Sequence, residues 1–143
     1  MIYTPLTKKA LKLCFEAHKN QVDKTNMPYV FHPFHLAEQM KDEYSTVCAL
    51  LHDVVEDTDY TFKDLENMNF PKEVIEALKL LTHEETVPYM EYVKALSVNP
   101  IAKAVKIADL THNSDTSRLD VVDEYALKRE EKYKKALEFL NNN

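Results

Sequence analysis

The stretch Ala49-Leu50-Leu51-His52-Asp53-Val54-Val55-Glu56-Asp57-Thr58 sets four ionisable residues into an aliphatic run. On a helix, at about 100° per residue, the imidazole and the three carboxylates fall within about 140° of one another, and the aliphatic side chains fall opposite. The stretch therefore predicts one continuous helix, capped at Ser45 or Thr46 and ending near Asp57, with one apolar and one charged side. Ala49 lies inside the charged arc and is small enough to leave room for water, or for a metal ion and a substrate.

The composition is that of an ordinary globular protein, with 143 residues, 45% hydrophobic and 29% charged. We expect one domain over residues 1–143. The net charge of −6 argues against nucleic acid as a partner, because that requires a basic face. No segment is long and apolar enough for a membrane span, and no signal peptide is apparent. With Cys14 and Cys48 expected as buried free thiols, the chain is expected to be cytoplasmic.

Glycine is absent from the whole sequence. This excludes phosphate-binding loops and dinucleotide fingerprints, which need backbone without a Cβ beside the phosphate. It also favours an all-α chain in which asparagine, aspartate and proline make the turns. Helix ends in a left-handed conformation are expected at Asn20, Asn67 or Asn113.

Apolar residues recur at helical spacing along the rest of the chain, which predicts an all-α helical bundle. The expected helices cover residues 6–20, 33–40, 71–81, 88–99, 100–113 and 122–140, in addition to the central one. Asn99 and Pro100 are a capping residue and a first helical residue. The pair His83-Glu84 is compatible with a chemical role, but nothing apolar flanks it to exclude water, so a solvated loop is expected.

Two further residues are candidates for a site. His32 stands immediately before Pro33, which places it just ahead of a helix and leaves its role open between metal ligand and cap. Asp109 lies on a helical face made largely of alanine and valine, where a carboxylate must be paired or bound to metal. Its ion pair with Lys106 and a ligand role are equally open alternatives.

Together these residues form a mixed set of nitrogen and oxygen donors from three separate elements: His32, His52, Asp53 and Asp109. Such a set suits Mn²⁺ or Fe²⁺ with positions open for water. A divalent ion makes water acidic at neutral pH and neutralises phosphate oxygens. Glu56 and Asp57 lie one helical turn further on, where they can orient water or act as general acid or base.

Four motifs occur in order along the chain: His18-x-x-Gln21-x-x-Lys24, Pro28-Tyr29-x-x-His32-Pro33, the central stretch, and Lys106-x-Ala108-Asp109-x-x-His112-Asn113. Over about residues 8–118 the pattern resembles the hydrolase domain of the RelA/SpoT family, within the HD phosphohydrolase superfamily. The resemblance implies a single all-α HD domain, followed here by a packing helix at about 122–140. It also implies hydrolysis of the 3′-pyrophosphate of guanosine tetra- and pentaphosphate (ppGpp and pppGpp).

The resemblance further assigns roles to residues. It implies Mn²⁺ held by His32, His52, Asp53 and Asp109. It implies Glu56 and Asp57 as the catalytic acidic pair. It places Lys24, Thr25 and Asn113 in the nucleotide pocket. The length leaves no room for a synthetase domain, so we expect the small, hydrolase-only form, with a homo-oligomer left open.

Two positions depart from the family pattern, with Asp23 where a cation is usual and Leu110 where arginine is usual. An acid facing a phosphate is unfavourable because like charges repel. These departures favour an alternative, a phosphohydrolase of another nucleotide or small phosphate compound. A second alternative is a non-catalytic nucleotide sensor, although Glu56 and Asp57 argue for catalysis.

Overall fold

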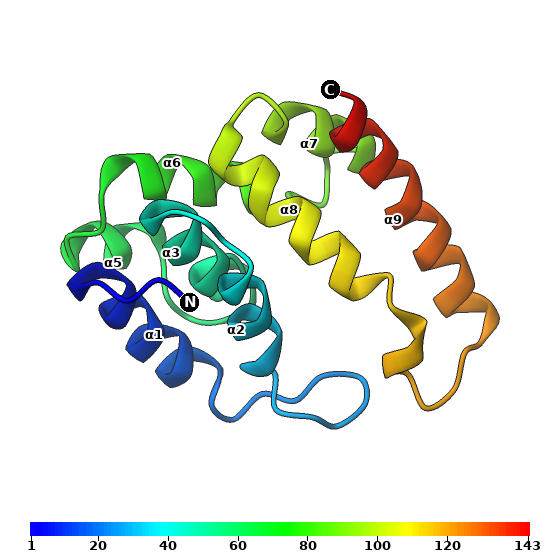
Figure 1. Ribbon diagram of the computed structural model, residues 1–143, viewed down its shortest axis with the longest axis horizontal. Coiled ribbons are helices and arrows are strands. Elements are labelled where there is room, and N and C mark those ends of the chain that lie inside the picture. Colours follow the sequence, from blue (N-terminus) through cyan, green and yellow to red (C-terminus); the bar gives the residue numbers. More distant parts are fainter.

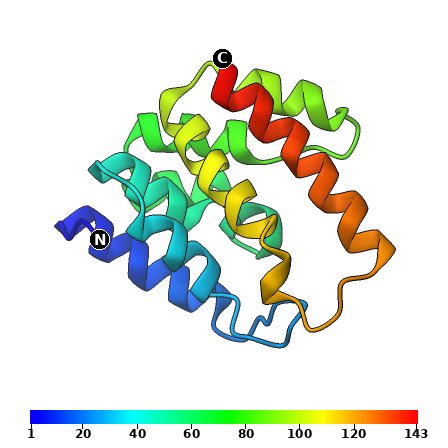
Figure 2. The ribbon, with the colours of Figure 1, turned by 45° about the vertical axis from the view of Figure 1, so that its right-hand side comes forward.

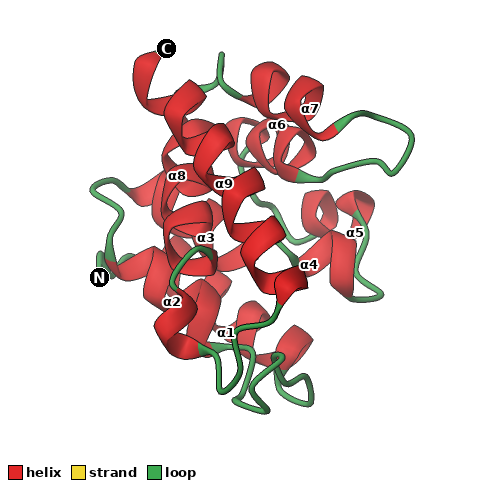
Figure 3. Ribbon diagram, turned by 90° about the vertical axis from the view of Figure 1, so that its right-hand side faces the viewer, coloured by secondary structure: helices red, strands yellow, loops and turns green.

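A computed structural model describes residues 1–143 as an all-helical bundle (Figure 1), which confirms the predicted fold class. Every regular element is a helix, as the view coloured by secondary structure shows (Figure 3). The helices are α1 (Pro5–His18), α2 (Phe31–Glu38), α3 (Glu43–Leu51), α4 (Val54–Asp57), α5 (Phe62–Asn67), α6 (Lys72–Leu81), α7 (Tyr89–Leu96), α8 (Pro100–Asn113), η1 (Thr116–Arg118) and α9 (Glu124–Asn142). None of them is long and apolar enough to cross a membrane.

Helix α3 is the centre of the packing. All its residues from Ser45 to Leu51 are buried, and it packs against α1, α2, α6 and α8. One continuous apolar core runs from Ala10 in α1 to Leu140 in α9. A residue at the carboxyl end of α3 is therefore delivered to the middle of the molecule.

The predicted central helix is interrupted, so the expectation of one continuous helix was wrong. Helix α3 ends at Leu51, Asp53 leaves the helical conformation with φ −108° and ψ 2°, and α4 then begins at Val54. The cap of α3 is Asp42, whose carboxylate accepts a hydrogen bond from the Ser45 amide. The apolar periodicity continues across the break, so periodicity alone does not reveal it.

Helix α2 begins at Phe31, two residues earlier than expected, so His32 lies inside its first turn. A proline at position 33 is compatible with this start, because amides in the first helical turn have no partner within the helix. His32 is thereby fixed on a buried part of the helix.

Two asparagines, Asn26 and Asn69, take the left-handed conformation, each with φ 65°. They replace the expected Asn20, Asn67 and Asn113. Both lie in turns, where the chain reverses over a few residues and a left-handed residue is needed.

Helices α8 and α9 pack side by side, and α9 also packs on α7 (Figure 2). Asn99 caps α8 as expected, accepting hydrogen bonds from the amides of Ile101 and Ala102, each at 3.0 Å. At one end of the molecule the loop of residues 19–30 lies beside η1, and Asp23 there faces Arg118. A cavity lies between the loop, α8 and α9.

Candidate metal centre and adjoining pocket

Three buried side chains from α2, the end of α3 and α8 meet in the core: His32, His52 and Asp109. The Nε2 atom of His32 lies 2.8 Å from Oδ1 of Asp109, and Nε2 of His52 lies 3.5 Å from the same oxygen. One ligand atom from each residue lies within 4.8 Å of the others. Such spacing is that of donors able to share one ion.

Asp53, the fourth expected ligand, lies at the edge of this group. Its Oδ2 atom is 3.0 Å from Nε2 of His52 and accepts a hydrogen bond from the Tyr29 hydroxyl. The break between α3 and α4 turns the carboxylate toward the group. Asp53 is therefore adjacent to the three converging residues rather than one of them.

The residues fit a bound cation. Nδ1 of His52 donates to the carbonyl oxygen of Ala49 at 2.7 Å, so Nε2 presents its lone pair toward the carboxylates. That Nε2 atom is buried and makes no well-aligned hydrogen bond, although carboxylate oxygens of Asp53 and Asp109 lie 3.0 and 3.5 Å from it. Burial lowers the pKa of His52, but Asp53 and Asp109 outweigh burial and raise this pKa well above its ordinary value. The pocket thus requires a positive charge, which a proton or a metal ion supplies.

Of the two alternatives left open for Asp109, the ion pair with Lys106 is present, and the ligand role stays a prediction with which the geometry is compatible. Its Oδ2 atom pairs with Lys106 Nζ at 3.1 Å, and its Oδ1 atom faces the two histidines. Asn113 also donates to Oδ1 at 3.0 Å. Burial raises the pKa of Asp109, yet Lys106 and the histidines hold that pKa well below its ordinary value.

A cavity of about 220 Å³ opens beside this centre. The side chains that line it include His52, Asp53, Glu56, Lys106 and Asp109. Glu56 lies on α4, and its pKa is raised by partial burial and by Asp53. Asp57 also has a raised pKa, again from partial burial and Asp53, but it is not part of this lining.

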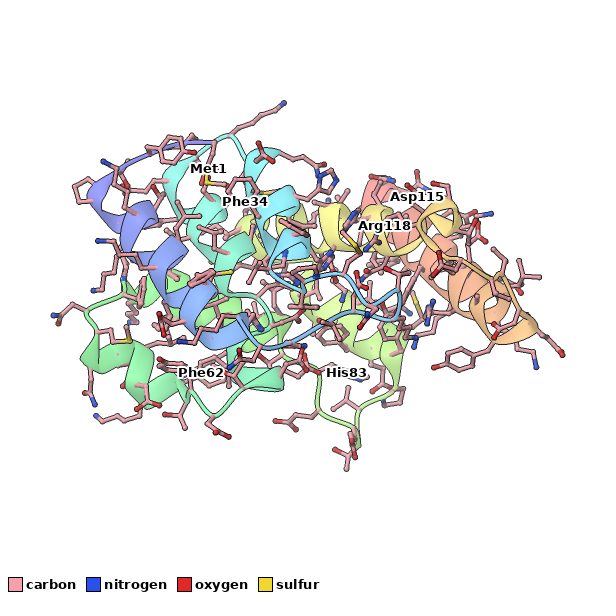
Figure 4. The ribbon with its side chains drawn as sticks, turned by 90° about the horizontal axis from the view of Figure 1, so that it is seen from below. Met1, Phe34, Phe62, His83, Asp115 and Arg118 are labelled. Carbon is pink, nitrogen blue, oxygen red and sulfur yellow. The ribbon has the colours of Figure 1, made fainter.

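Residues from α7, α9 and the loop before α7 also line the cavity, and of these only His83 was considered as a candidate from the sequence. His83, labelled in Figure 4, bonds through Nε2 to the Val87 carbonyl oxygen at 2.6 Å and stacks on Tyr92 at 4.6 Å between ring centroids. His83 is therefore partly buried against tyrosines, whereas Glu84, Glu85 and Thr86 are exposed as expected for a solvated loop. Lys132 of α9 lies 4.2 Å from the centroid of Tyr89. In the sequence, the helical spacing of Tyr89 and Tyr92 was the one feature that could have indicated this wall of the cavity.

A second cavity, of about 350 Å³, holds the three residues expected in the nucleotide pocket, Lys24, Thr25 and Asn113. Arg118 and Arg129 also line it, together with Tyr29 and Tyr133. Asn113 and Tyr133 line both cavities and so separate the expected nucleotide pocket from the metal centre.

Asp23 is engaged within its own loop. Its Oδ1 atom accepts hydrogen bonds from the Thr25 amide, the Thr25 hydroxyl and the Met27 amide at 2.8, 2.7 and 3.1 Å. Its Oδ2 atom lies 3.9 Å from Arg118, which Figure 4 shows beside Asp115. These partners offset much of the repulsion that Asp23 was expected to exert on a phosphate.

Leu110, the other departure, is fully buried in the core and lines neither cavity. An arginine is thus missing at this position, and the leucine contributes to packing alone. The cations of the larger cavity come instead from the loop, η1 and α9.

The fold and the His52-Asp53 pair beside a second histidine and aspartate are the features expected from the resemblance to HD domains. No family model matches the chain. Its sequence is similar to that of guanosine-3′,5′-bis(diphosphate) 3′-pyrophosphohydrolases, which confirms the resemblance to the RelA/SpoT hydrolase domains. The Aquifex aeolicus enzyme is 31% identical over 139 residues, which cover 89% of this chain and 19% of that protein. The Xenopus tropicalis enzyme MESH1 is 33% identical over 118 residues, which cover 73% and 65%.

The fold is also that of a solved structure, a metazoan ortholog of SpoT that hydrolyzes ppGpp. The two superpose with a TM-score of 0.74 at 24% identity, over 98% of this chain and 87% of the other. This chain spans about a fifth of the length of the bacterial relatives it matches. It spans just under two thirds of MESH1.

Proposed function

We propose that this chain is a Mn²⁺-dependent hydrolase that removes the 3′-pyrophosphate of guanosine tetra- and pentaphosphate. The observation that carries the proposal is the convergence of His32, His52 and Asp109, with one ligand atom from each within 4.8 Å of the others, next to an open cavity. The names of the similar proteins supply the substrate. The mixed nitrogen and oxygen donors support Mn²⁺ or Fe²⁺ over a structural zinc site.

In this proposal His32, His52 and Asp109 hold the ion, with Asp53 as the fourth ligand. When bound, the ion supplies an acidic water and neutralises charge that develops on the phosphoryl oxygens. Lys106 holds the Asp109 carboxylate in place, because its ammonium occupies the Oδ2 atom and leaves Oδ1 toward the histidines.

The remaining roles belong to side chains that line the two cavities. Glu56 takes the proton of the attacking water, and its raised pKa brings it closer to the pH at which a base works best. Asp57 acts beside it as the second acid of the pair. Lys24, Thr25 and Asn113 bind the nucleotide in the larger cavity, where Arg118 and Arg129 add positive charge toward its phosphates.

The test is hydrolysis of guanosine tetraphosphate by the purified protein, with Mn²⁺ and with EDTA. The reaction is measured by the release of pyrophosphate and guanosine diphosphate. We expect turnover in the presence of Mn²⁺ and no turnover in the presence of EDTA. His52→Ala should lose both metal and turnover, while Glu76→Gln, at an exposed ion pair on α6, should keep both. Full activity of a metal-free His52→Ala protein would contradict the proposal.

A second candidate is hydrolysis of another nucleotide or small phosphate compound, and the burial of Leu110 favours it because a cation usual at that position is missing. A screen of nucleoside monophosphates and 3′-phosphorylated nucleotides, each with Mn²⁺ and with EDTA, separates the two. A higher kcat/KM for a nucleotide without a pyrophosphate selects the second candidate. Tight binding without turnover points instead to the sensor alternative.

A further inference from the structure

His32 and His52 differ in the group that contacts Nδ1, the ring nitrogen that points away from the metal centre. Histidines that bind metals usually donate their other ring N–H to an acceptor, which fixes the tautomer and the ring orientation. For His52 this acceptor is the carbonyl oxygen of Ala49, 2.7 Å from Nδ1. A backbone carbonyl serves this purpose whatever side chain stands at residue 49.

For His32 the corresponding partner is a side chain. Its Nδ1 atom lies 2.7 Å from Nδ1 of His112, and the two rings lie in nearly parallel planes, 8° apart, with centroids 5.0 Å apart. Only one of the two Nδ1 atoms can carry the proton of this hydrogen bond. Because Nε2 of His32 faces Asp109 and the other donors, the lone pair is needed there, and the proton belongs on Nδ1.

We infer that His112 is a positioning residue for the metal centre: its Nδ1 lone pair accepts the hydrogen bond from His32 Nδ1–H and so directs the His32 Nε2 lone pair at the ion. This inference rests on the proposed metal site. His112 lies one turn beyond Asp109 on α8, so the same helix supplies a ligand and the acceptor that orients another ligand. His112 is only partly buried, which lets its own Nε2–H reach water.

The surroundings hold His112 in this arrangement. Its ring packs against His35 on α2, with centroids 4.3 Å apart, and Arg118 donates to its backbone carbonyl at 2.8 Å. His35 contacts only the far partner of the pair, so it offers a matched control that perturbs the cluster without removing the acceptor.

The test measures the dissociation constants of Mn²⁺ and Co²⁺ by titration calorimetry, together with the visible absorption spectrum of bound Co²⁺. His112→Phe keeps an aromatic ring and removes the acceptor, and we expect about 10- to 100-fold weaker binding and an altered Co²⁺ spectrum. His112→Asn places an amide oxygen near the former Nδ1 and should restore most of the affinity. His35→Phe should bind like the parent protein.

Parent-like affinity of His112→Phe, or no recovery in His112→Asn, overturns the inference while leaving the proposed function intact. Failure of the unaltered protein to bind either ion overturns both. A measurement without any variant gives a second check. In the Zn²⁺-loaded protein, ring ¹⁵N shifts should report the proton on Nδ1 of His32 and on Nε2 of His112, and the opposite tautomers would refute the assignment.

Discussion

The carboxylate of Asp109 pairs with Lys106 through one oxygen and faces His32 and His52 with the other. The ion pair with Lys106 offsets the cost of burying this charge. The two side chains are 10% and 13% exposed, so removing the lysine leaves a nearly dry negative charge. Lys106→Met should therefore lower the free energy of unfolding of the metal-free protein by about 3–5 kcal/mol.

Because a divalent ion restores positive charge beside Asp109, added Mn²⁺ should stabilise Lys106→Met more than it stabilises the parent. Urea denaturation with Mn²⁺ and with EDTA measures both effects. Lys103→Met, on the same helix, is the control and should show neither. Equal metal responses of Lys106→Met and the parent would contradict this account.

Glu56 lies close enough to the centre to act on a water there, yet it is not one of the converging donors. Glu56→Gln preserves shape and removes the base, so kcat should fall about 10²- to 10⁴-fold while Mn²⁺ affinity changes little. Steady-state kinetics and metal titration together check this. The control is Glu76→Gln, at an exposed ion pair on α6, and a parent-like kcat for Glu56→Gln would remove Glu56 from the mechanism.

At the scale of elements, the loop of residues 21–28 is organised by Asp23. Partial burial raises the pKa of Asp23, but the hydrogen bonds from Thr25 and Met27 and the charge of Arg118 lower it below its ordinary value of 3.8. The resulting stabilisation is fully present above that ordinary value, and it is lost as the pH falls through the lowered folded-state pKa.

Asp23→Asn keeps an oxygen acceptor and loses the charge, so it should cost about 1 kcal/mol near neutral pH. The difference from the parent should shrink below about pH 4. Denaturation curves between about pH 7 and pH 2.5 measure it. A pH-independent difference would show that the charge of Asp23 does not stabilise the loop, and Asp120→Asn serves as a surface control.

The elements of the site show where sequence patterns succeed and where they stop. Pro100 after Asn99 and the apolar spacing of α6 or α8 follow local rules, so these helices appear where expected. The break at Asp53 follows no such local rule, because the apolar helical spacing continues on both sides of it. His83 was expected to be solvated because nothing apolar flanks it in sequence, and the tyrosines that cover it lie further on, in α7.

At the scale of the whole molecule, α9 carries one wall of both cavities, including Arg129, Lys132 and Tyr133. Its end is anchored by Leu140, which is fully buried. Leu140→Ala should destabilise the protein by about 2–5 kcal/mol because it leaves a cavity in the core.

Leu127→Ala on the same helix should change stability by less than about 0.5 kcal/mol, since that side chain is 55% exposed. Urea denaturation compares the two variants. If α9 instead docks through its charged face, the two variants would lose similar amounts of stability.

The convergence of His32, His52 and Asp109 was within reach of the sequence, because each residue is fixed by a strong local pattern or motif. The position of Asn113 and Tyr133 between the two cavities could not be predicted from the sequence, because it depends on how α8 and α9 pack. The neutralisation of Asp23 by Arg118 likewise joins positions far apart in the chain.

The absence of glycine has a consequence for the chain before it folds. Glycine gives a disordered chain its greatest conformational freedom, so a sequence without it has less entropy to lose. Replacing a glycine by alanine at a position whose conformation alanine tolerates stabilises a protein by about 0.4–1 kcal/mol in this way. Asn26 and Asn69 give back part of that gain by holding φ at 65°. Some of the stability of this domain therefore resides in the narrowness of its unfolded ensemble, where no contact in the folded structure displays it.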